Sequence, residues 1–197
     1  MYPSSIKKII DQFLTLPGIG PKTAERLALS IASRPKSKIE EFINSFVGLE
    51  NLKVCQMCRN FADTNPCEIC SSTSRDKFTI CVVSTPKELE AIERTHKYNG
   101  LYHTLGGLID PIMGITPDKL FIKELTERIK NENTKELILA FDTSIQGEAT
   151  ITYLKNILVN LGVKITRLAK GIPMGTDIEY TDEITLTSAL ENRKELN

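Results

Sequence analysis

Two Cys-x-x-Cys pairs constrain this chain more than any other feature of its sequence. Cys55 and Cys58 form the first pair and Cys67 and Cys70 form the second, so four of the five cysteines fall within sixteen residues. Two such pairs joined by a short loop can place four thiolates at the corners of a tetrahedron, with Zn–S distances of about 2.3 Å. The spacing therefore predicts a structural site for one Zn²⁺ ion per chain, closed to any substrate.

Two disulfide bonds or a redox pair are the alternative interpretations of these cysteines. The N-terminus shows no secretory signal, and the chain has one further cysteine, Cys81. Both observations favour a reducing cytoplasm, where this spacing is typical of a metal site. A single redox pair would also leave the second pair unexplained. We expect Cys81, which lies inside an apolar run, to be a small buried residue.

Charge is balanced overall but uneven along the chain. The 25 Lys and Arg residues equal the 25 Asp and Glu residues, so total charge gives no argument for nucleic-acid binding. Residues 1–38, however, carry seven basic and two acidic residues, whereas residues 172–197 carry two basic and six acidic ones. This asymmetry indicates either an anionic ligand at the basic end or contacts between copies. No apolar run approaches the roughly 18 residues of a membrane span.

The first fifty residues predict three helices. Apolar residues recur with helical spacing from Ile6 to Leu14, and Pro21 suits the first position of a second helix. A third helix is expected over residues 37–52, because Ser37 and Glu40 have the spacing of a capping box.

The glycine-rich turn between the first two helices has the chemistry of a phosphate site. Gly18 and Gly20 lack a Cβ, so their backbone can approach a ligand closely. The helix that follows presents unpaired N–H groups and its positive dipole end. Lys22 and Arg26 lie one turn apart on the same face of that helix. The pattern predicts contact with a DNA backbone without sequence recognition, and a turn that merely packs two helices is the structural alternative.

After residue 77 the pattern predicts an α/β fold. Residues 71–76 are polar and are interpreted as a linker. Apolar, β-branched runs then alternate with amphipathic segments, which is typical of a parallel sheet covered on both faces. The expected strands are 78–83, 101–105, 137–141 and 163–168, and the expected helices are 86–95, 119–129, 147–161 and a last one capped by Thr181 or Asp182.

Ligands of such sheets bind beyond the carboxyl ends of the strands. Asp142 and Glu148 follow the third strand and are the leading acidic candidates. The structural alternative for Asp142 is to cap the helix that begins near Gly147. The two histidines, His96 and His103, have no metal-ligand neighbour at a useful spacing and are interpreted as ordinary surface or strand residues.

Two segments resemble known folds. Residues 16–24 resemble the helix-hairpin-helix motif of non-specific DNA-binding proteins, and residues 78–173 resemble the Toprim fold of topoisomerases and primases. Catalytic Toprim members hold Mg²⁺ with a Glu after the first strand and an Asp-x-Asp after a later one. Here Ser84 stands in place of the Glu and Ser144 in place of the second Asp. Asp142 is then the one matching carboxylate, and a single carboxylate supplies too few ligands for such a Mg²⁺ site. A Mg²⁺-dependent nuclease or primase is therefore only the alternative function.

The order of these segments resembles the RecR family of bacterial recombination proteins. The resemblance covers residues 2–196 and includes residues 74–76, 105–107, 147–150 and 175–186. It implies a helix-hairpin-helix domain, a C4-type zinc finger, a Toprim domain and a C-terminal Walker-B-like segment with a helix. The corresponding boundaries are 1–53, 54–71, 78–173 and 174–197.

The family resemblance implies a non-enzymatic recombination mediator of the bacterial cytoplasm, associated with the nucleoid. Such proteins form tetrameric rings that can encircle duplex DNA, and they act with RecO and RecF to load RecA on gapped DNA coated by single-strand-binding protein. For this chain the expected assembly is a tetrameric ring or a dimer. The matching DNA contacts are Lys22 and Arg26. The acidic Toprim surface tied to RecO corresponds to Asp142, Gln146 and Glu148, and Gln146 stands where the family usually has Glu. The Walker-B-like segment suits packing and ring contacts, because no Walker A motif accompanies it.

A zinc-stabilised scaffold that binds only proteins is a third hypothesis. It differs from the DNA-binding mediator because it gives Lys22 and Arg26 of the glycine-rich turn no role.

Overall fold

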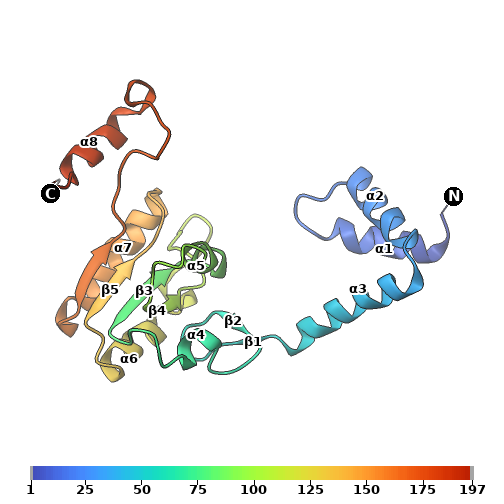
Figure 1. The fold of residues 1–197 in the computed structure, drawn as a ribbon, viewed down its shortest axis with the longest axis horizontal. Coiled ribbons are helices and arrows are strands. Elements are labelled where there is room, and N and C mark those ends of the chain that lie inside the picture. The colour runs from blue at the N-terminus through green and yellow to red at the C-terminus, as the bar shows by residue number, and fades with distance from the viewer. Residues whose placement is uncertain (1, 196–197) are drawn as a thin grey trace. The chain divides into compact units, whose positions relative to one another are not determined.

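The structure, a computed structural model that describes residues 2–195, divides into two compact units, Met1–Leu52 and Lys53–Asn197. The first unit is helical, and the second contains two sheets and several helices (Figure 1). This arrangement confirms the predicted α/β class with a helical N-terminal region. Within residues 2–195, no helix has both the length and the apolar character needed to cross a membrane.

The first unit consists of α1 (Ser4–Leu14), α2 (Pro21–Ala32) and α3 (Lys36–Gly48). Helices α1 and α2 pack against each other, and Ala24 and Ala28 of α2 are fully buried. Their small side chains allow the close approach of the two helices. The predicted helix–turn–helix arrangement and the start of α2 at Pro21 are confirmed.

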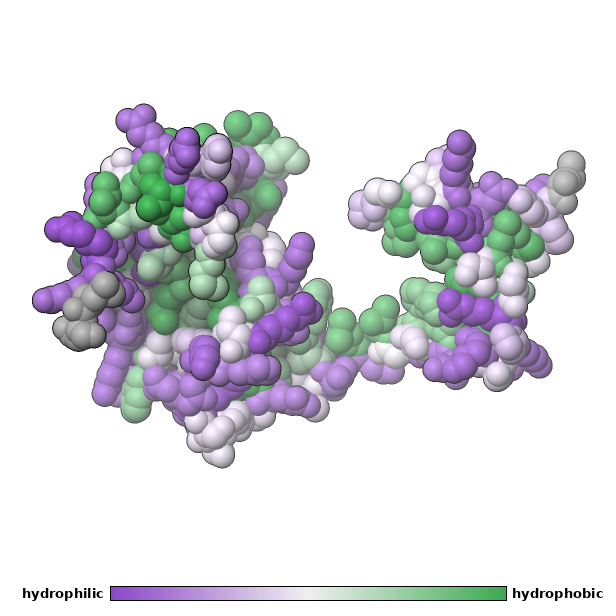
Figure 2. Space-filling view, turned by 45° about the horizontal axis from the view of Figure 1, so that its top comes forward, coloured by the Kyte–Doolittle hydropathy of each residue, from purple (hydrophilic) through white to green (hydrophobic). Residues whose placement is uncertain are grey.

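Helix α3 differs from its prediction at both ends. It begins one residue before Ser37, with Pro35 as the N-cap and no side-chain cap, so the predicted capping box is wrong. The proline sets the backbone for the first turn and makes a hydroxyl cap unnecessary. A 3-10 turn replaces its last turn. Much of the apolar face of α3 is exposed, including Ile43 and Phe46 at 52% and 55%, and Figure 2 shows green apolar surface on this unit beside purple charged side chains.

The main sheet of the second unit has four parallel strands in the order β4-β3-β5-β6. The strands are β3 (Thr79–Val83), β4 (Leu101–Thr104), β5 (Glu136–Leu139) and β6 (Lys164–Arg167). Helices α5 (Pro86–Glu93), α6 (Ile122–Asn131) and α7 (Ile145–Leu158) connect them. The alternation predicted from the apolar runs is therefore confirmed.

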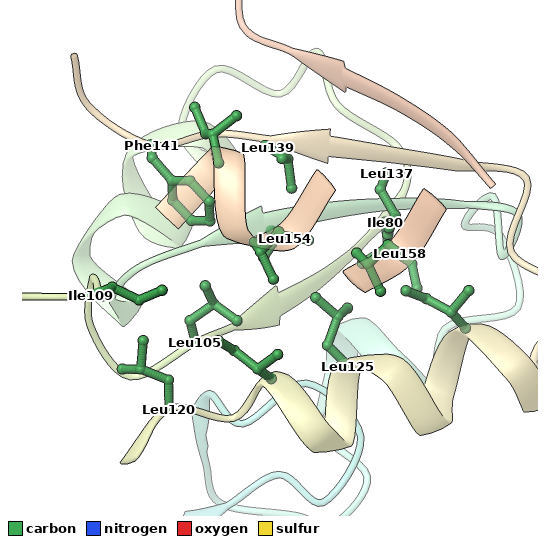
Figure 3. Packing of buried hydrophobic residues seen from close by; sticks show 14 of the residues in the cluster. Ile80, Leu105, Ile109, Leu120, Leu125, Leu137, Leu139, Phe141, Leu154 and Leu158 are labelled. Atoms are coloured by element: carbon green, nitrogen blue, oxygen red, sulfur yellow. The ribbon is translucent and has the colours of Figure 1, made fainter. Parts of the chain in front are cut away.

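Both faces of this sheet are buried, as predicted. Helices α6 and α7 cover one face, where Leu125, Leu154 and Leu158 are fully buried against the strands (Figure 3). Helix α5 covers the other face through Leu89. Each of these leucines stabilises the fold by about 1.5–3 kcal/mol relative to an exposed side chain.

Two strand residues match their predicted structural roles. His103 of β4 is fully buried, and its Nε2 atom lies 2.8 Å from the Phe121 carbonyl oxygen. Burial lowers the pKa of His103 to about 4, so the imidazole is neutral near pH 7. Cys81 of β3 is 2% exposed, as expected for a small buried residue.

The segment before β3 is anchored and is not the free linker predicted from its polarity. The Arg75 guanidinium donates two hydrogen bonds to Glu93 of α5, at 3.0 and 2.6 Å, and a third to the Gly100 carbonyl oxygen. The Asp76 N–H also donates to the Asn99 carbonyl oxygen at 2.9 Å. Polar composition concealed these contacts because their partners lie 18 to 25 residues away.

The chain ends with helix α8 (Glu183–Glu191). The Asp182 side chain accepts a hydrogen bond from the Thr185 N–H at 2.9 Å, so Asp182, one of the two predicted residues, is the cap. Ile184 and Leu190 of α8 are 83% and 66% exposed.

Candidate metal centre and nucleic-acid interface

The cysteine segment folds as two strands and a short helix: β1 (Lys53–Val54), β2 (Phe61–Ala62) and α4 (Glu68–Ser71). Strands β1 and β2 pair antiparallel. Between them the chain turns tightly, because the Arg59 N–H donates to the Cys55 carbonyl oxygen at 2.9 Å and the Cys55 N–H donates to the Asn60 carbonyl oxygen at 2.8 Å. Arg59 has a φ of 61°, the left-handed conformation that closes this turn. In the second cysteine pair, Cys67 is the N-cap of α4 and Cys70 lies in its only turn.

The four cysteine sulfur atoms lie within 4.8 Å of one another, and all four residues are buried. The Cys58 and Cys67 sulfurs are 3.6 Å apart. Sulfur atoms bound to one tetrahedral Zn²⁺ at about 2.3 Å would be about 3.8 Å apart, so the site fits this ion. All four cysteines are free thiols, and the disulfide alternative has no support. The donor set of Cys55, Cys58, Cys67 and Cys70 suits one structural zinc ion.

The ionisation of these thiols points to the same cation. The hydrogen bond between Cys70 and Cys58 lowers the pKa of Cys58 and raises the pKa of Cys70. Burial raises the pKa of Cys67. The charge of one thiolate opposes the ionisation of its neighbours. Four thiolates at this spacing need a bound cation to neutralise them.

The zinc knuckle, residues 53–71, packs directly on the four-stranded sheet. The Thr104 N–H of β4 donates to the Cys58 carbonyl oxygen at 2.8 Å. Arg128 of α6 donates to the Tyr102 and Met57 carbonyl oxygens at 2.7 and 3.2 Å, and its side chain is only 4% exposed. Since β4 is an edge strand, these bonds cover backbone groups that would otherwise face solvent.

Sequence reasoning missed Arg128, although a signal was available. Arg128 lies three residues after Leu125 and directly before Ile129, on the apolar face of α6. A charged residue on a buried helical face needs partners for its charge and its N–H groups. Those partners are two carbonyl oxygens and Glu132, which accepts from the guanidinium at 2.7 Å.

At the glycine-rich turn of the first unit, the two glycines have different roles. Gly18 has a φ of +78°, which favours glycine, whereas Gly20 is the N-cap of α2 with a φ of −88°. No atom lies within 4 Å of the position where a Cβ would stand at either residue. The turn is therefore open to a ligand.

Lys22 and Arg26 project from the first two turns of α2 and are both exposed. Lys36 and Lys38 pair with acidic residues of α3, but no ion-pair partner of Lys22 or Arg26 occurs among residues 2–195. In the same described part of the chain, the Lys22 and Thr23 N–H groups donate no hydrogen bond. Two free cations and two free donors thus converge on one open corner, which suits a phosphate.

The third predicted cluster lies where β5 ends and α7 begins. Ser144 caps α7, because its hydroxyl accepts from the Gly147 N–H at 3.1 Å, so the alternative that Asp142 itself caps this helix is wrong. The Asp142 carboxylate instead accepts hydrogen bonds from the N–H and hydroxyl of Ser144. Gly147 is required here, since a Cβ would collide with the Asp142 carbonyl oxygen. Asp142 thus orients the residue that caps the helix.

Ser84 stands at the position that holds a Glu in catalytic Toprim proteins, and the site is occupied by contacts within the chain. Ser84 is buried, and its N–H donates to the Glu88 carboxylate at 2.7 Å. Glu88 and Thr85 also form the capping box of α5. Glu88 is therefore committed to a structural role at the start of α5.

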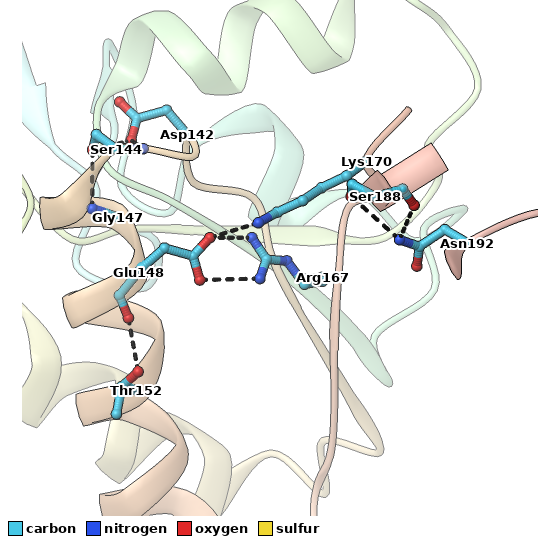
Figure 4. A network of polar contacts seen from close by, with 9 residues as sticks. All are labelled: Asp142, Ser144, Gly147, Glu148, Thr152, Arg167, Lys170, Ser188 and Asn192. Atoms are coloured by element: carbon cyan, nitrogen blue, oxygen red, sulfur yellow. Dashed lines mark hydrogen bonds and ion pairs between the residues drawn. The ribbon is translucent and has the colours of Figure 1, made fainter. Parts of the chain in front are cut away.

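Glu148 is paired inside the chain (Figure 4). Its carboxylate accepts two hydrogen bonds from Arg167 of β6, at 2.7 and 3.1 Å, and one from Lys170 at 2.8 Å. The hydrogen bonds from Arg167, followed by the one from Lys170, are the main reasons that the pKa of Glu148 is lowered to about 2. Gln146, the remaining member of the predicted set, donates to the Asp110 carboxylate at 3.3 Å.

An ordered loop with an apolar tip lies beside Gln146. The Asp110 carboxylate accepts from the Ile112 and Met113 N–H groups, and Asp110 and Ile115 form a β-bridge across the loop. The loop holds Ile112 and Met113 in solvent, at 93% and 74% exposure. Ile145, next to Gln146, is 86% exposed. Sequence reasoning did not single out these apolar residues.

Comparison with known proteins accounts for nearly the whole chain. Four family models match it: the RecR helix-hairpin-helix over residues 6–47, the RecR four-cysteine zinc finger domain over 52–72, the Toprim domain over 79–169 and the RecR C-terminal region over 171–194. The fold and these matches define a recombination protein that carries a helix-hairpin-helix, a four-cysteine zinc finger and a Toprim domain.

A curated relative gives the particular family. Over 193 residues the chain is 48% identical to "Recombination protein RecR" of Clostridium perfringens, covering 98% of this chain and 97% of the relative. The chain therefore belongs to the RecR family, whose members are recombination mediators in DNA repair. The family named from the sequence motifs is confirmed, as are the helix-hairpin-helix, zinc finger and Toprim assignments.

Proposed function

We propose that this chain is a non-enzymatic mediator that binds DNA through Gly18, Gly20, Lys22 and Arg26. It works with RecO and RecF to promote the loading of RecA on gapped DNA coated by single-strand-binding protein. The observation that carries this proposal is the open corner at the start of α2, where free N–H groups and two unpaired cations converge. Contacts with phosphates alone bind DNA of any sequence.

The engagement of the Toprim carboxylates supports a non-enzymatic role. Asp142 orients Ser144 at the end of β5, and Glu88 caps α5 after the end of β3. In the described part of the chain, Cys55, Cys58, Cys67 and Cys70 form the one group of three or more potential metal ligands that come close together. A Mg²⁺ site would have to break contacts that hold the ends of β3 and β5.

The surface around Asp142, Gln146 and Glu148 is proposed to bind RecO. Asp142 is exposed, and Gln146 and Glu148 are half-buried beside it. The exposed apolar tip of Ile112 and Met113 adjoins Gln146 through Asp110. Apolar side chains held rigidly next to carboxylates are typical of a surface that binds another protein.

The four proposed domains are 1–53, 54–71, 78–173 and 174–197, and the assembly is proposed to be a tetrameric ring or a dimer. Helix α3 leaves Ile43, Phe46 and Val47 about half exposed, and α1, α2 and α3 line an apolar groove of about 340 Å³. A second copy of the chain would bury these side chains, which water covers in a monomer.

The function is tested by incubating the pure protein with labelled single-stranded and duplex DNA in Mg²⁺ or Mn²⁺. We expect intact DNA in a retarded band, because Asp142 and Glu88 are committed to structural contacts. Cleaved or extended DNA that disappears with Asp142→Ala would instead support the enzyme, and DNA without retardation would support the protein-only scaffold.

Assembly is tested by measuring the mass in solution with and without DNA. We expect a multiple of the 22.0 kDa chain mass, and a shift toward the monomer with Phe46→Ser, because the serine removes apolar area from the proposed interface. Lys38→Ser on the polar side of the same helix is the matched control. A monomer at micromolar concentration, with and without DNA, would contradict the ring.

A further inference from the structure

The cluster of Glu148, Arg167 and Lys170 has a geometry that the proposed partner surface does not explain. Arg167 is the last residue of β6, and Lys170 follows three residues later. Both donate to the Glu148 carboxylate of α7, and Arg167 does so with two nitrogens (Figure 4). A guanidinium fork on two oxygens, completed by a lysine, is also the geometry with which proteins hold a phosphate group.

The surroundings of the cluster have room for such a group. A cavity of about 460 Å³ is lined by all three residues, and the hydroxyl-bearing Thr185 and Ser188 of α8 line it as well. It lies beyond the carboxyl ends of β5 and β6, the edge at which open parallel sheets bind ligands. The first turn of α7, which carries Glu148, adds its positive dipole end to the two cations.

We propose that Arg167 and Lys170 form a phosphate-binding site, and that the Glu148 carboxylate occupies this site as an internal substitute when no phosphate is bound. The phosphate comes from the DNA backbone or from a free nucleotide. The site is separate from Lys22 and Arg26, which belong to the other compact unit.

The exposure of the three side chains makes this exchange feasible. The side chains of Glu148, Arg167 and Lys170 are 42%, 37% and 32% exposed. Ion pairs at such exposure contribute little to stability, because water screens them and the side chains lose entropy. An incoming phosphate can therefore replace the carboxylate at small cost, whereas it could not break a fully buried pair.

The exchange couples the site to the proposed partner surface, and this part of the inference rests on the proposed function. A partner whose cations pair with Glu148 would release Arg167 and Lys170. Partner binding would then raise the affinity for a phosphate through a single shared carboxylate.

The test measures DNA affinity at several salt concentrations for Glu148→Gln. This change keeps the shape and removes the charge, so the two cations are free to bind a phosphate. We expect affinity to rise about threefold to tenfold, the range for freeing two half-exposed ion pairs. The slope of log affinity against log salt should steepen by about one to two units. Adding Arg167→Gln and Lys170→Gln should abolish both gains.

Glu90→Gln is the matched control. Glu90 pairs with Arg94 at 3.0 Å on the surface of α5, so its removal changes net charge equally, away from the cavity. Equal gains from Glu90→Gln and Glu148→Gln would overturn the proposal. No gain from Glu148→Gln in either DNA affinity or phosphate-dependent melting temperature would overturn it as well.

The melting temperature in ATP or inorganic phosphate identifies the source of the phosphate. If these ligands raise the melting temperature of Glu148→Gln but its DNA affinity does not increase, the site binds a free nucleotide. If its DNA affinity increases but these ligands do not raise its melting temperature, the site binds the DNA backbone. The effect of Lys22 and Arg26 variants on DNA binding is measured separately, so failure of this site and failure of the proposed function give different results.

Discussion

Replacing Cys67 with serine is expected to lower the melting temperature by roughly 10 °C. A metal present at about 1,000 times its Kd stabilises a fold by about 4 kcal/mol, and for a chain of this size each kcal/mol corresponds to roughly 2–4 °C. Serine cannot supply the fourth thiolate, so the remaining sulfurs hold zinc weakly. The zinc content, measured on the same samples, should fall from one ion per chain toward zero.

Cys81→Ala is the matched control for the loss of a thiol. Cys81 is as buried as the four ligands but lies in β3 among apolar residues. This variant should keep one zinc ion per chain and lose only the stability that a small cavity removes, about 1 kcal/mol. An unchanged melting temperature in Cys67→Ser would contradict the metal assignment.

Removing both cations of the glycine-rich turn, Lys22→Gln with Arg26→Gln, is expected to weaken DNA binding by at least about a hundredfold at low salt. Each phosphate contact contributes about 0.9 to the salt dependence of duplex binding, and in the proposed multi-chain assembly the loss is repeated in every chain. The salt dependence should become correspondingly flatter. Gel retardation and fluorescence anisotropy at about 50–200 mM salt measure both quantities.

Lys36→Gln with Lys38→Gln removes the same charge from the same unit. These lysines pair with Glu40 and Glu41 at 3.8 and 2.6 Å and belong to α3, not to the glycine-rich turn. They should reduce DNA affinity by less than about threefold, because only long-range attraction is lost. Equal losses of DNA affinity in the two double variants would show that net charge, and not the glycine-rich turn, binds DNA. An unchanged DNA affinity in Lys22→Gln with Arg26→Gln would favour a protein-only scaffold.

The sequence predicted those parts of the molecule in which one local pattern decides the structure. The apolar runs around Ile80 and Leu137 located two central strands, because buried parallel strands are apolar throughout. The cysteine spacing located the metal ligands, because the four thiols lie close in sequence as well as in space. The start of α2 at Pro21 followed from the fixed φ of proline.

The parts that sequence reasoning missed depend on pairs far apart in the chain. Arg128 donates to Met57, which lies 71 residues earlier, and Arg167 pairs with Glu148, which lies 19 residues earlier. No periodic pattern connects such residues, so their partners appear only once the strands are in register. The capping of α7 was open for a related reason, because both Asp142 and Ser144 have the right chemistry and only the backbone path selects the serine.

The covering of β4 by the zinc knuckle decides how this sheet can grow. The β4 edge of the sheet is covered, since Thr104 and Tyr102 already form hydrogen bonds with the zinc knuckle and with Arg128. A strand donated by another molecule could therefore join only at β6, which pairs with β5 alone among the described strands. Lys164 and Arg167 on β6 discourage non-specific pairing at this edge, because charged side chains there oppose the addition of a further strand.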